Sequence, residues 1–132
     1  MQTIGAVLET VAAGRAEISL PFRSDLTQQH GYLHAGVVAT IADSACGYAA
    51  YSLMPADVSV LTVEYKINLL APAVGDRFIA RATVIRPGRT LTVVEADVFA
   101  SVQGEERRTA TMLATIIAVR DRPDRPDVAR LA

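Results

Sequence analysis

The pattern of apolar and polar positions predicts a β-hairpin at the start of the chain. Residues 6–21 hold two short apolar runs on either side of Ala12–Arg15. In the second run Ala16, Ile18 and Leu20 alternate with polar residues. Strict alternation is typical of a half-buried strand, so we expect two strands joined by a tight turn.

A loop and one long helix are expected next. The segment RSDLTQQHGYLHAG is polar, contains two glycines and has no sustained period, which predicts an ordered loop. Residues Gly36–Leu53 lack proline and are dominated by small and aliphatic residues, so we expect a helix of about five turns. Apolar and small residues cover every side of it, which predicts a helix enclosed by other structure. A membrane span is disfavoured, because the stretch is shorter than the roughly 20 apolar residues required and contains Asp43.

Four long runs rich in β-branched residues follow and predict antiparallel strands. They are VSVLTVEYKINLL, DRFIARATVIR, RTLTVVEADVFAS and ERRTATMLATIIAV, separated by segments that supply turn residues. We therefore expect one α+β domain over residues 1–120, in which a sheet of about six strands curls around the helix. Residues 121–132 have too little apolar content to pack, and we expect a disordered tail there.

The outer face of this sheet is expected to remain partly apolar. A face of this kind exceeds what a soluble monomer normally exposes, so we expect a second subunit to cover part of it. The residues expected on this face are Val60, Ile79, Ile85, Leu91, Val93, Leu113 and Ile117.

Composition and charge narrow the classes of function. The chain has 132 residues, of which 51% are hydrophobic, and a formal net charge of −1, as expected for one soluble domain. This charge gives no general attraction to nucleic acid or anionic lipid, so neither nucleic acid nor a membrane is expected as a partner. The one cysteine, Cys46, excludes an intramolecular disulfide, and the N-terminal segment has no export signal. We expect a cytoplasmic protein.

Asp43 is the residue that most requires an explanation, because it is the one carboxylate within Gly36–Leu53. An unpaired buried carboxylate is costly, so it must be paired, neutralised or functional. A structural role would pair it with a backbone donor or an arginine; a catalytic role would make it a base or a nucleophile. The segment His34-Ala35-Gly36 favours catalysis, since free N–H groups at a helix start can stabilise an oxyanion.

The other reactive side chains have simpler interpretations. His30 and His34 lie four residues apart in a loop without an evident third ligand, so no metal site is expected. Cys46 has no neighbouring cation in the sequence to lower its pKa and is interpreted as a small buried filler. Tyr48 and Tyr51 are expected to pack or to line a pocket.

A longer motif connects these residues. The segment Gln28-x-x-Gly31-x-x-His34-Ala35-Gly36, followed by Ala42-Asp43, resembles the motif of hotdog-fold acyl-CoA thioesterases of the phenylacetate-pathway, or PaaI-like, family. That motif places Asn or Gln six residues before His-Gly-Gly and an acidic residue nine after the histidine, and both spacings hold here.

The resemblance extends to about Val119. It implies a hotdog fold and hydrolysis of an acyl- or aryl-CoA thioester to a free acid and coenzyme A, without a cofactor. A hotdog hydratase or dehydratase and a non-catalytic acyl-CoA- or lipid-binding module are the alternatives.

The resemblance also implies roles for individual residues. Asp43 would attack the thioester carbonyl or activate water, while the Ala35 N–H, next to Gly36 at the helix start, would polarise the thioester oxygen. Gln28 would orient the thioester or the water. Ala35 replaces the first glycine of the motif, and a backbone donor survives this change unless the position needs a positive φ.

Further positions have supporting roles, of which those of His34 and Thr62 are implied by the same resemblance. His34 would brace the loop, and Thr62 would position water near the carboxylate. Tyr48 would line the substrate site. Arg86 and Arg89, which flank a Pro-Gly turn, would clasp the coenzyme A phosphates unless they belong to a solvated turn. The competing cations are Arg77, Arg81 and Lys66.

The resemblance finally implies an assembly. Each site would lie at a dimer interface, with the Gln28–Ala35 loop of one chain facing Asp43 and Thr62 of the other. We therefore expect a homodimer, and a dimer of dimers where the outer sheet face is also covered.

Overall fold

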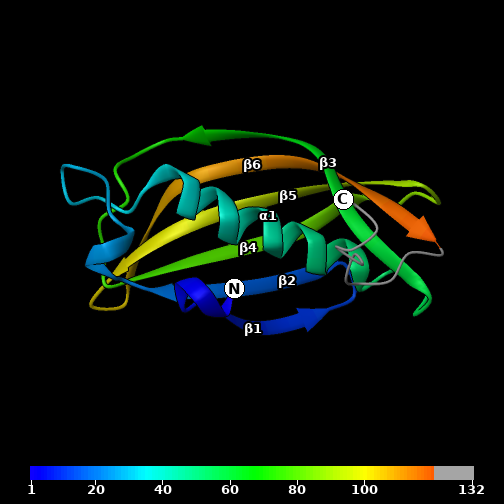
Figure 1. Ribbon diagram of the computed structural model, residues 1–132, viewed down its shortest axis with the longest axis horizontal. Coiled ribbons are helices and arrows are strands. Elements are labelled where there is room, and N and C mark those ends of the chain that lie inside the picture. Colours follow the sequence, from blue (N-terminus) through cyan, green and yellow to red (C-terminus); the bar gives the residue numbers. More distant parts are fainter. Residues whose placement is uncertain (121–132) are drawn as a thin grey trace, which may run out of the picture.

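Six strands form one antiparallel sheet that curls around helix α1 in the computed structural model, which describes residues 1–120 (Figure 1). The elements are η1 (Gln2–Ile4), β1 (Val7–Ala12), β2 (Arg15–Pro21), η2 (Ser24–Leu26), α1 (Ala35–Tyr51), β3 (Val58–Leu69), β4 (Arg77–Arg86), β5 (Leu91–Val102) and β6 (Glu105–Arg120). This arrangement confirms the predicted α+β class and hotdog fold. The tail expected at residues 121–132 lies outside the described residues.

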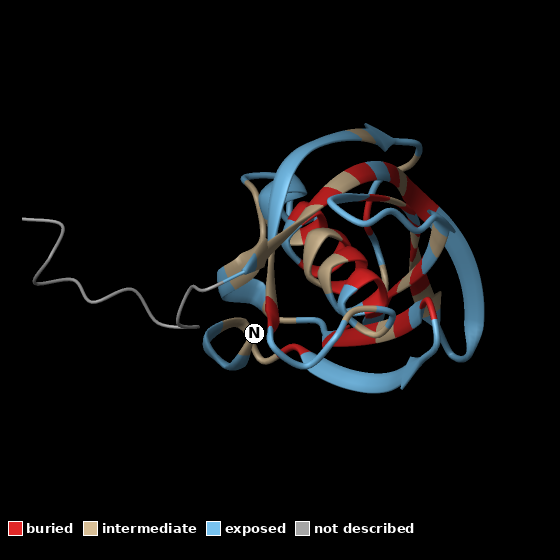
Figure 2. Ribbon diagram, turned by 90° about the vertical axis from the view of Figure 1, so that its right-hand side faces the viewer, coloured by how far each residue is buried: buried red, intermediate tan, exposed pale blue. Residues whose placement is uncertain are grey.

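The strand order across the sheet is β1-β2-β4-β5-β6-β3. The hairpin of β1 and β2 forms one edge, and β3 forms the other, although β3 follows the hairpin in the chain. The connection between β2 and β3 carries α1 across the concave face of the sheet. In Figure 2 the sheet surrounds much of the helix, and the buried residues line the space between them. No helix within residues 1–120 is long and apolar enough to cross a membrane.

Small residues on α1 allow this close enclosure. Five of the eight buried residues of α1 are alanines, whereas the sheet contributes large side chains such as Ile18, Leu20 and Phe78, which are fully buried. A thin helix surface opposite large side chains fills the interior at the density typical of protein cores. The core is therefore a bulky concave sheet closed over a narrow helix.

The helix begins and ends slightly earlier than predicted. We expected Gly36–Leu53, and the structure has Ala35–Tyr51. The His34 side chain caps the N-terminus by accepting from the Gly36 N–H. At the other end the Leu53 N–H bonds to the Ala50 carbonyl, three residues back, so the chain tightens into a turn.

The expectation of a helix enclosed on every side is wrong for one stripe of α1. Gly36, Thr40, Tyr48 and Tyr51 are exposed, and Asp43 between them is half-buried. At 100° per residue these positions fall within about 140° around the helix axis and therefore share one broad face. The curled sheet covers the remaining faces but leaves this stripe open in the single chain.

The outer face of the sheet is partly apolar, as expected, with two corrections. Ile85, Leu91 and Leu113 are exposed, each by about half. Val60 instead packs against the core, because a β-bulge between Thr62 and Glu64 reverses the alternation of β3.

Ile79 is the second correction, since it is 7% exposed. In the sheet register it lies between Ser19 and Phe99. Arg77 and Arg81, two residues to either side on the same face, are held by ion pairs across the strands. Long neighbouring side chains thus cover a position that alternation alone places in solvent.

The turn between β4 and β5 offers a test of this fold. A Cβ atom on Gly88 would lie 2.0 Å from the Leu91 carbonyl oxygen, so the backbone of the turn must move to admit it. We expect Gly88→Ala to lower the free energy of unfolding by about 1–3 kcal/mol. The measurement is urea unfolding at one fixed protein concentration.

Pro87→Ala is the control for this test, because it alters the same exposed turn without adding an atom next to Leu91. We expect it to change the free energy of unfolding by less than about 1 kcal/mol. Equal losses for the two variants would contradict the tight approach of Gly88 to the Leu91 carbonyl.

Candidate active site

The loop before α1 places Gln28 by a tight turn. The Gly31 N–H donates to the Gln28 carbonyl (2.9 Å), and Gly31 has a φ of 79°, which favours glycine. The Gln28 N–H donates to the Tyr32 carbonyl (2.9 Å). The side-chain oxygen of Gln28 accepts from the His30 N–H. The oxygen is therefore engaged within the loop, and the side-chain NH₂ group is left as a donor.

The start of α1 leaves one backbone donor available. The Gly36 N–H donates to His34 Nδ1 (2.9 Å), and the Val37 and Val38 N–H groups donate to the His34 carbonyl (2.9 and 3.1 Å). Within the described residues the Ala35 N–H has no acceptor, and Ala35 is exposed. The donor that the helix start can offer to a ligand is therefore that of Ala35.

Two details of this cap bear on the sequence motif. Ala35 is helical and is not among the described residues with a positive φ, so alanine fits where the motif has glycine. A Cβ on Gly36 would lie 3.1 Å from His34 Nδ1 and would press on the capping ring. His34 thus braces the loop, and the Gly36 amide serves the cap in this structure.

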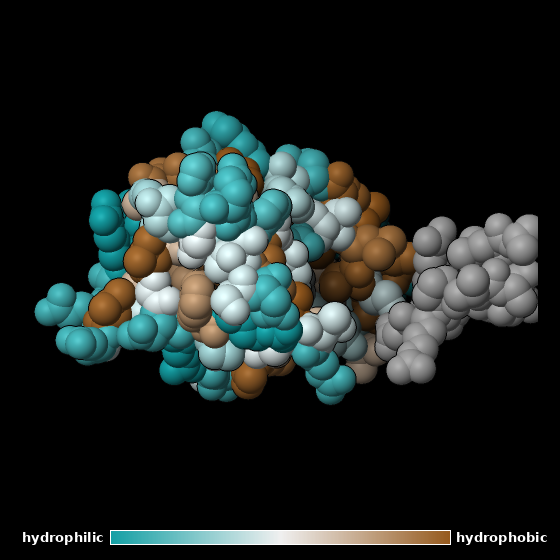
Figure 3. Space-filling view, turned by 60° about the vertical axis from the view of Figure 1, so that its left-hand side comes forward, coloured by the Kyte–Doolittle hydropathy of each residue, from teal (hydrophilic) through white to brown (hydrophobic). Residues whose placement is uncertain are grey.

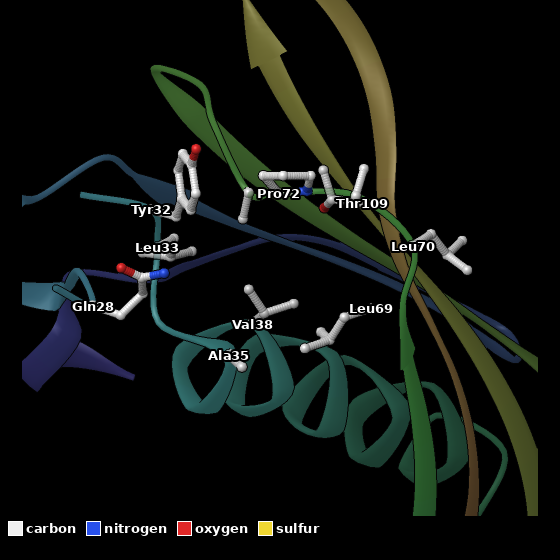
Figure 4. A pocket seen from close by; sticks show the side chains of 11 residues that line it. Gln28, Tyr32, Leu33, Ala35, Val38, Leu69, Leu70, Pro72 and Thr109 are labelled. Carbon is white, nitrogen blue, oxygen red and sulfur yellow. The ribbon is translucent and has the colours of Figure 1, made fainter. Parts of the chain in front are cut away.

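A pocket of about 360 Å³ opens beside these groups (Figure 4). Gln28, Tyr32 and Ala35 line it from the loop and the helix start, and Val38 lines it from the first turns of α1. The segment Leu69–Ala73, which begins with the last residue of β3, and Thr109 of β6 complete it. In Figure 4 the amide nitrogen of Gln28 is on the side facing Ala35 and Val38, and its oxygen is on the far side.

Sequence reasoning missed the segment Leu69–Ala73 and Thr109. The N–H groups of Leu70 and Ala71 both donate to the Thr109 carbonyl (2.8 and 3.2 Å), which fixes this segment against β6. The two parts are almost forty residues apart, and only the pairing of β3 with β6 reveals that they meet. No local motif signals this contact.

Asp43 and Thr62 form a second group. The Thr62 hydroxyl donates to Asp43 Oδ1 at 2.7 Å and joins α1 to β3. The structure thus places at the carboxylate the hydroxyl that the resemblance implied, rather than an arginine or a backbone donor. Asp43 is half-buried on the open stripe of α1, and the β-bulge immediately after Thr62 lies beside this contact. One carboxylate oxygen is oriented by Thr62, which leaves the other for a reacting group.

The two groups are separated within one chain. Ala35 and Asp43 are eight residues apart on one helix, which corresponds to about 12 Å along its axis at 1.5 Å per residue. A single thioester carbonyl cannot contact the Ala35 N–H and the Asp43 carboxylate across that distance. Neither Asp43 nor Thr62 lines the pocket that contains Gln28 and Ala35.

Cys46 is a buried residue with an unreactive thiol. It has no exposed surface, and burial, assisted by the negative charge of Asp43, raises the pKa of its thiol to about 12. This confirms the interpretation of Cys46 as a filler rather than a nucleophile. Tyr48 is 39% exposed on the open stripe and does not line the pocket of its own chain.

The candidate phosphate-binding arginines lie far from the pocket. Figure 1 shows the loop before α1 at one end of the molecule and the β4–β5 turn, with Arg86 and Arg89, at the other. Arg77 pairs with Glu9 at 2.6 Å.

Arg81 is the most strongly paired cation of the sheet. Its guanidinium bonds to both Glu106 and Glu17, and these bonds raise its pKa. Within residues 1–120, by contrast, Arg86, Arg89 and Lys66 form no ion pair. Of the five cations considered for phosphate binding, these three therefore remain available to a ligand. In the same range no three His, Cys, Asp or Glu side chains gather as a metal site requires.

Comparison with known proteins identifies relatives of this chain. The family profile described as thioesterase superfamily matches residues 30–106. A crystal structure of a thioesterase family protein from Silicibacter pomeroyi has 56% identity and a TM-score of 0.89, covering 91% of this chain and 88% of that one. The 1,4-dihydroxy-2-naphthoyl-CoA hydrolase of Listeria monocytogenes is 31% identical over 94 residues, which are 71% of this chain and 76% of the relative. A Bacillus halodurans protein solved with CoA has 27% identity and a TM-score of 0.72, covering 78% of this chain and 66% of that one.

Other relatives share the fold at lower sequence identity or are matched over only part of their length. The PaaI protein of E. coli shares the fold with a TM-score of 0.79, at 20% identity over 89% of this chain and 82% of that one. The chain spans 66% and 59% of the length of two archaeal relatives, from Halobacterium salinarum and Saccharolobus solfataricus, to which it is 35% and 34% identical. Since the family profile covers more than half of its residues, the chain belongs to the thioesterase superfamily.

Proposed function

We propose that this protein is an acyl-CoA thioesterase, which hydrolyses an acyl- or aryl-CoA thioester to a free acid and coenzyme A. The observation that carries the proposal is the pairing of an available backbone donor at Ala35 with an oriented carboxylate at Asp43, eight residues apart on one helix. The first can polarise a carbonyl, and the second can supply a base or a nucleophile. Membership of the thioesterase superfamily supports this chemistry.

The reaction divides between the two groups. The Ala35 N–H donates to the thioester oxygen and stabilises the oxyanion that forms when the carbonyl is attacked. In one route Asp43 removes a proton from water, the water oxygen bonds to the carbonyl carbon, and the C–S bond breaks. The departing thiolate then takes the proton from Asp43. In the other route an Asp43 oxygen bonds to the carbonyl carbon, and the C–S bond breaks to release the thiolate. Water then hydrolyses the resulting anhydride, which frees the acid and Asp43, and the thiolate takes a proton from that water. Both routes use the carboxylate oxygen that Thr62 leaves free.

A complete site requires two chains in this proposal. Ala35 and Asp43 of one chain are about 12 Å apart along the helix axis. If α1 of a second chain lies antiparallel along the open stripe, Asp43 of each chain comes next to Ala35 of the other. The edge strand β3, whose Thr62 contacts Asp43 on that stripe, carries further exposed apolar residues that support a contact with a second chain; they are Leu61, Val63 and Tyr65. Figure 3 shows apolar side chains exposed at several places on the face in view, among hydrophilic ones. We propose a homodimer, with the exposed outer sheet face available for a dimer of dimers.

Coenzyme A is the proposed thiol of the substrate. Two relatives support it, since one is named as a CoA thioester hydrolase and another was solved with CoA. Arg86 and Arg89, which lack ion-pair partners within residues 1–120, are the proposed contacts of its phosphates. In an antiparallel dimer the end of one chain that carries these arginines lies toward the pocket of the other chain. Tyr48, on the same half of α1 as that end, is proposed to line the substrate site there.

The proposed reaction needs water and substrate, with no cofactor. We place it in the cytoplasm, where a single buried thiol such as Cys46 needs no partner. The two alternatives differ in measurable ways. An acyl-CoA-binding module binds substrate without releasing thiol, and a hydratase or dehydratase changes the acyl chain while the thioester stays intact.

Replacement of the carboxylate tests the catalytic role of Asp43. Asp43→Asn keeps the shape and can still accept the Thr62 hydrogen bond, but it removes the base or nucleophile. We expect kcat for thiol release to fall at least about a hundredfold, with the same circular dichroism and oligomeric state. The control is Asp57→Asn, at an exposed carboxylate beyond the helix, which should retain activity. Near-normal turnover by Asp43→Asn would make Asp43 structural.

Subunit mixing tests the shared site. Gln28→Ala and Asp43→Asn each disable every site of their own homodimer, and Gln28→Ala must first be shown to be strongly impaired. A heterodimer then contains one site with both defects and one with none. Random exchange should recover about a quarter of the wild-type activity, because half of the dimers are mixed. Verified exchange without recovery would show that the site is built within one chain.

A third test concerns the phosphate contacts. We expect Arg86→Ala or Arg89→Ala to raise KM for acyl-CoA several-fold and to leave hydrolysis of the corresponding acyl-pantetheine nearly unchanged. Arg108→Ala, which breaks a surface ion pair with Asp97, is the control for loss of a positive charge. Equal losses on both substrates would point to a defect in the acyl site or in folding instead.

A further inference from the structure

The pocket at the helix start indicates which part of the substrate it receives. This step rests on the proposed function, in which the Ala35 N–H marks the position of the thioester oxygen. Ala35 lines the pocket, so a thioester bound there has one of its two arms inside the pocket. The arms differ in chemistry: one is the acyl group, and the other is the pantetheine chain, with two amides and a phosphorylated nucleotide at its end.

The lining of the pocket is chemically selective. Its walls are mostly aliphatic, with Leu33, Val38 and Leu69 turned toward the same space in Figure 4, and none of its residues is charged. The buried hydroxyl of Thr109 already donates to the Val98 carbonyl at 3.2 Å. The polar side chains left to pair with the amides of a pantetheine arm are those of Gln28 and Tyr32, whereas an apolar group loses no hydrogen bond by entering.

The size of the pocket limits the group that fits. A water molecule occupies about 30 Å³ of liquid volume, so the space of about 360 Å³ corresponds to about twelve non-hydrogen atoms. A medium-length acyl chain or a single substituted ring fits within this limit. A sixteen-carbon chain exceeds it, and a two-carbon chain leaves most of the pocket empty.

We infer that this pocket is the acyl-binding site and that it selects uncharged, apolar acyl groups of no more than about a dozen non-hydrogen atoms. Leu69 is the residue that sets its length limit. It lies at the end of β3, its side chain faces Val38 across the pocket, and it is 56% exposed in the single chain. A change of size at Leu69 therefore alters the pocket without emptying the core. Acyl groups with a terminal carboxylate are excluded, because no cation lines the pocket to pair with the charge.

The test measures kcat/KM for thiol release over a series of straight-chain acyl-CoA substrates from two to sixteen carbons, with succinyl-CoA and benzoyl-CoA added. For the wild type we expect kcat/KM to rise about fourfold per methylene until the pocket is full, and then to level or fall. Hexanoyl-CoA should exceed succinyl-CoA at least about a hundredfold. Leu69→Ala should move the optimum to longer chains, and Leu69→Phe to shorter ones, so that the ratio of decanoyl- to butyryl-CoA hydrolysis differs at least about tenfold between the two variants.

Val74→Ala and Val74→Phe are the matched controls, since Val74 is similarly exposed in the next loop but does not line the pocket. They should keep the wild-type profile. A uniform rise of KM over all chain lengths in the Leu69 variants would overturn the inference, because it would place the pantetheine arm in the pocket. Efficient hydrolysis of succinyl-CoA would also overturn it. Failure of the folded wild type to hydrolyse any acyl-CoA would refute the proposed function itself, whereas hydrolysis with unaltered chain preference in the Leu69 variants would refute only the acyl assignment.

Discussion

The enclosure of α1 by the curled sheet is the constraint on which the other features depend. Because five alanines form much of its buried surface, the helix can lie deep in the sheet, and its axis is fixed relative to β3 and the loop before it. The Thr62–Asp43 hydrogen bond and the Ala35 donor are both defined by that axis. A bulkier helix would stand further from the sheet and would separate Asp43 from Thr62. The small residues of α1 therefore determine both how the helix packs in the sheet and where Asp43 and the Ala35 N–H lie.

The N-terminus of α1 determines which backbone donor the candidate site can offer. His34 caps α1 with its ring nitrogen and its carbonyl, which together engage the Gly36, Val37 and Val38 amides. The Ala35 N–H is the donor that these contacts leave available at the helix start. A single fixed donor suits oxyanion stabilisation, because a preorganised group needs no rearrangement as charge develops. His34 thus holds the helix start through both its ring and its carbonyl.

Much of the fold was predictable, because alternation and composition act locally. The hairpin of β1 and β2, the four later strands and the single long helix all follow from periodicity, and the structure confirms them. The bulge after Thr62 was not predictable by this means, since one unpaired residue reverses the faces of a strand and leaves no local signature; Val60 was misplaced for that reason. The open stripe of α1 was missed because small residues such as Gly47 look alike in a core and at an interface. In the candidate site, spacing along the chain singled out Gln28, Ala35 and Asp43 as candidates, whereas the pocket wall at Leu69–Ala73 depends on a pairing between distant strands.

The same spacing that makes the motif recognisable also argues for a shared site. Eight residues on a helix are just over two turns, so Ala35 and Asp43 lie within about 80° of one another around the axis yet about 12 Å apart along it. A twofold axis across the open stripe converts that separation into proximity between chains, because it reverses the direction of the second helix. The half-buried state of Asp43 fits this arrangement: a carboxylate that becomes desolvated only on assembly costs little in the isolated chain, and its reactivity is confined to the assembled site. Assembly would thus be a condition of the chemistry as well as of stability.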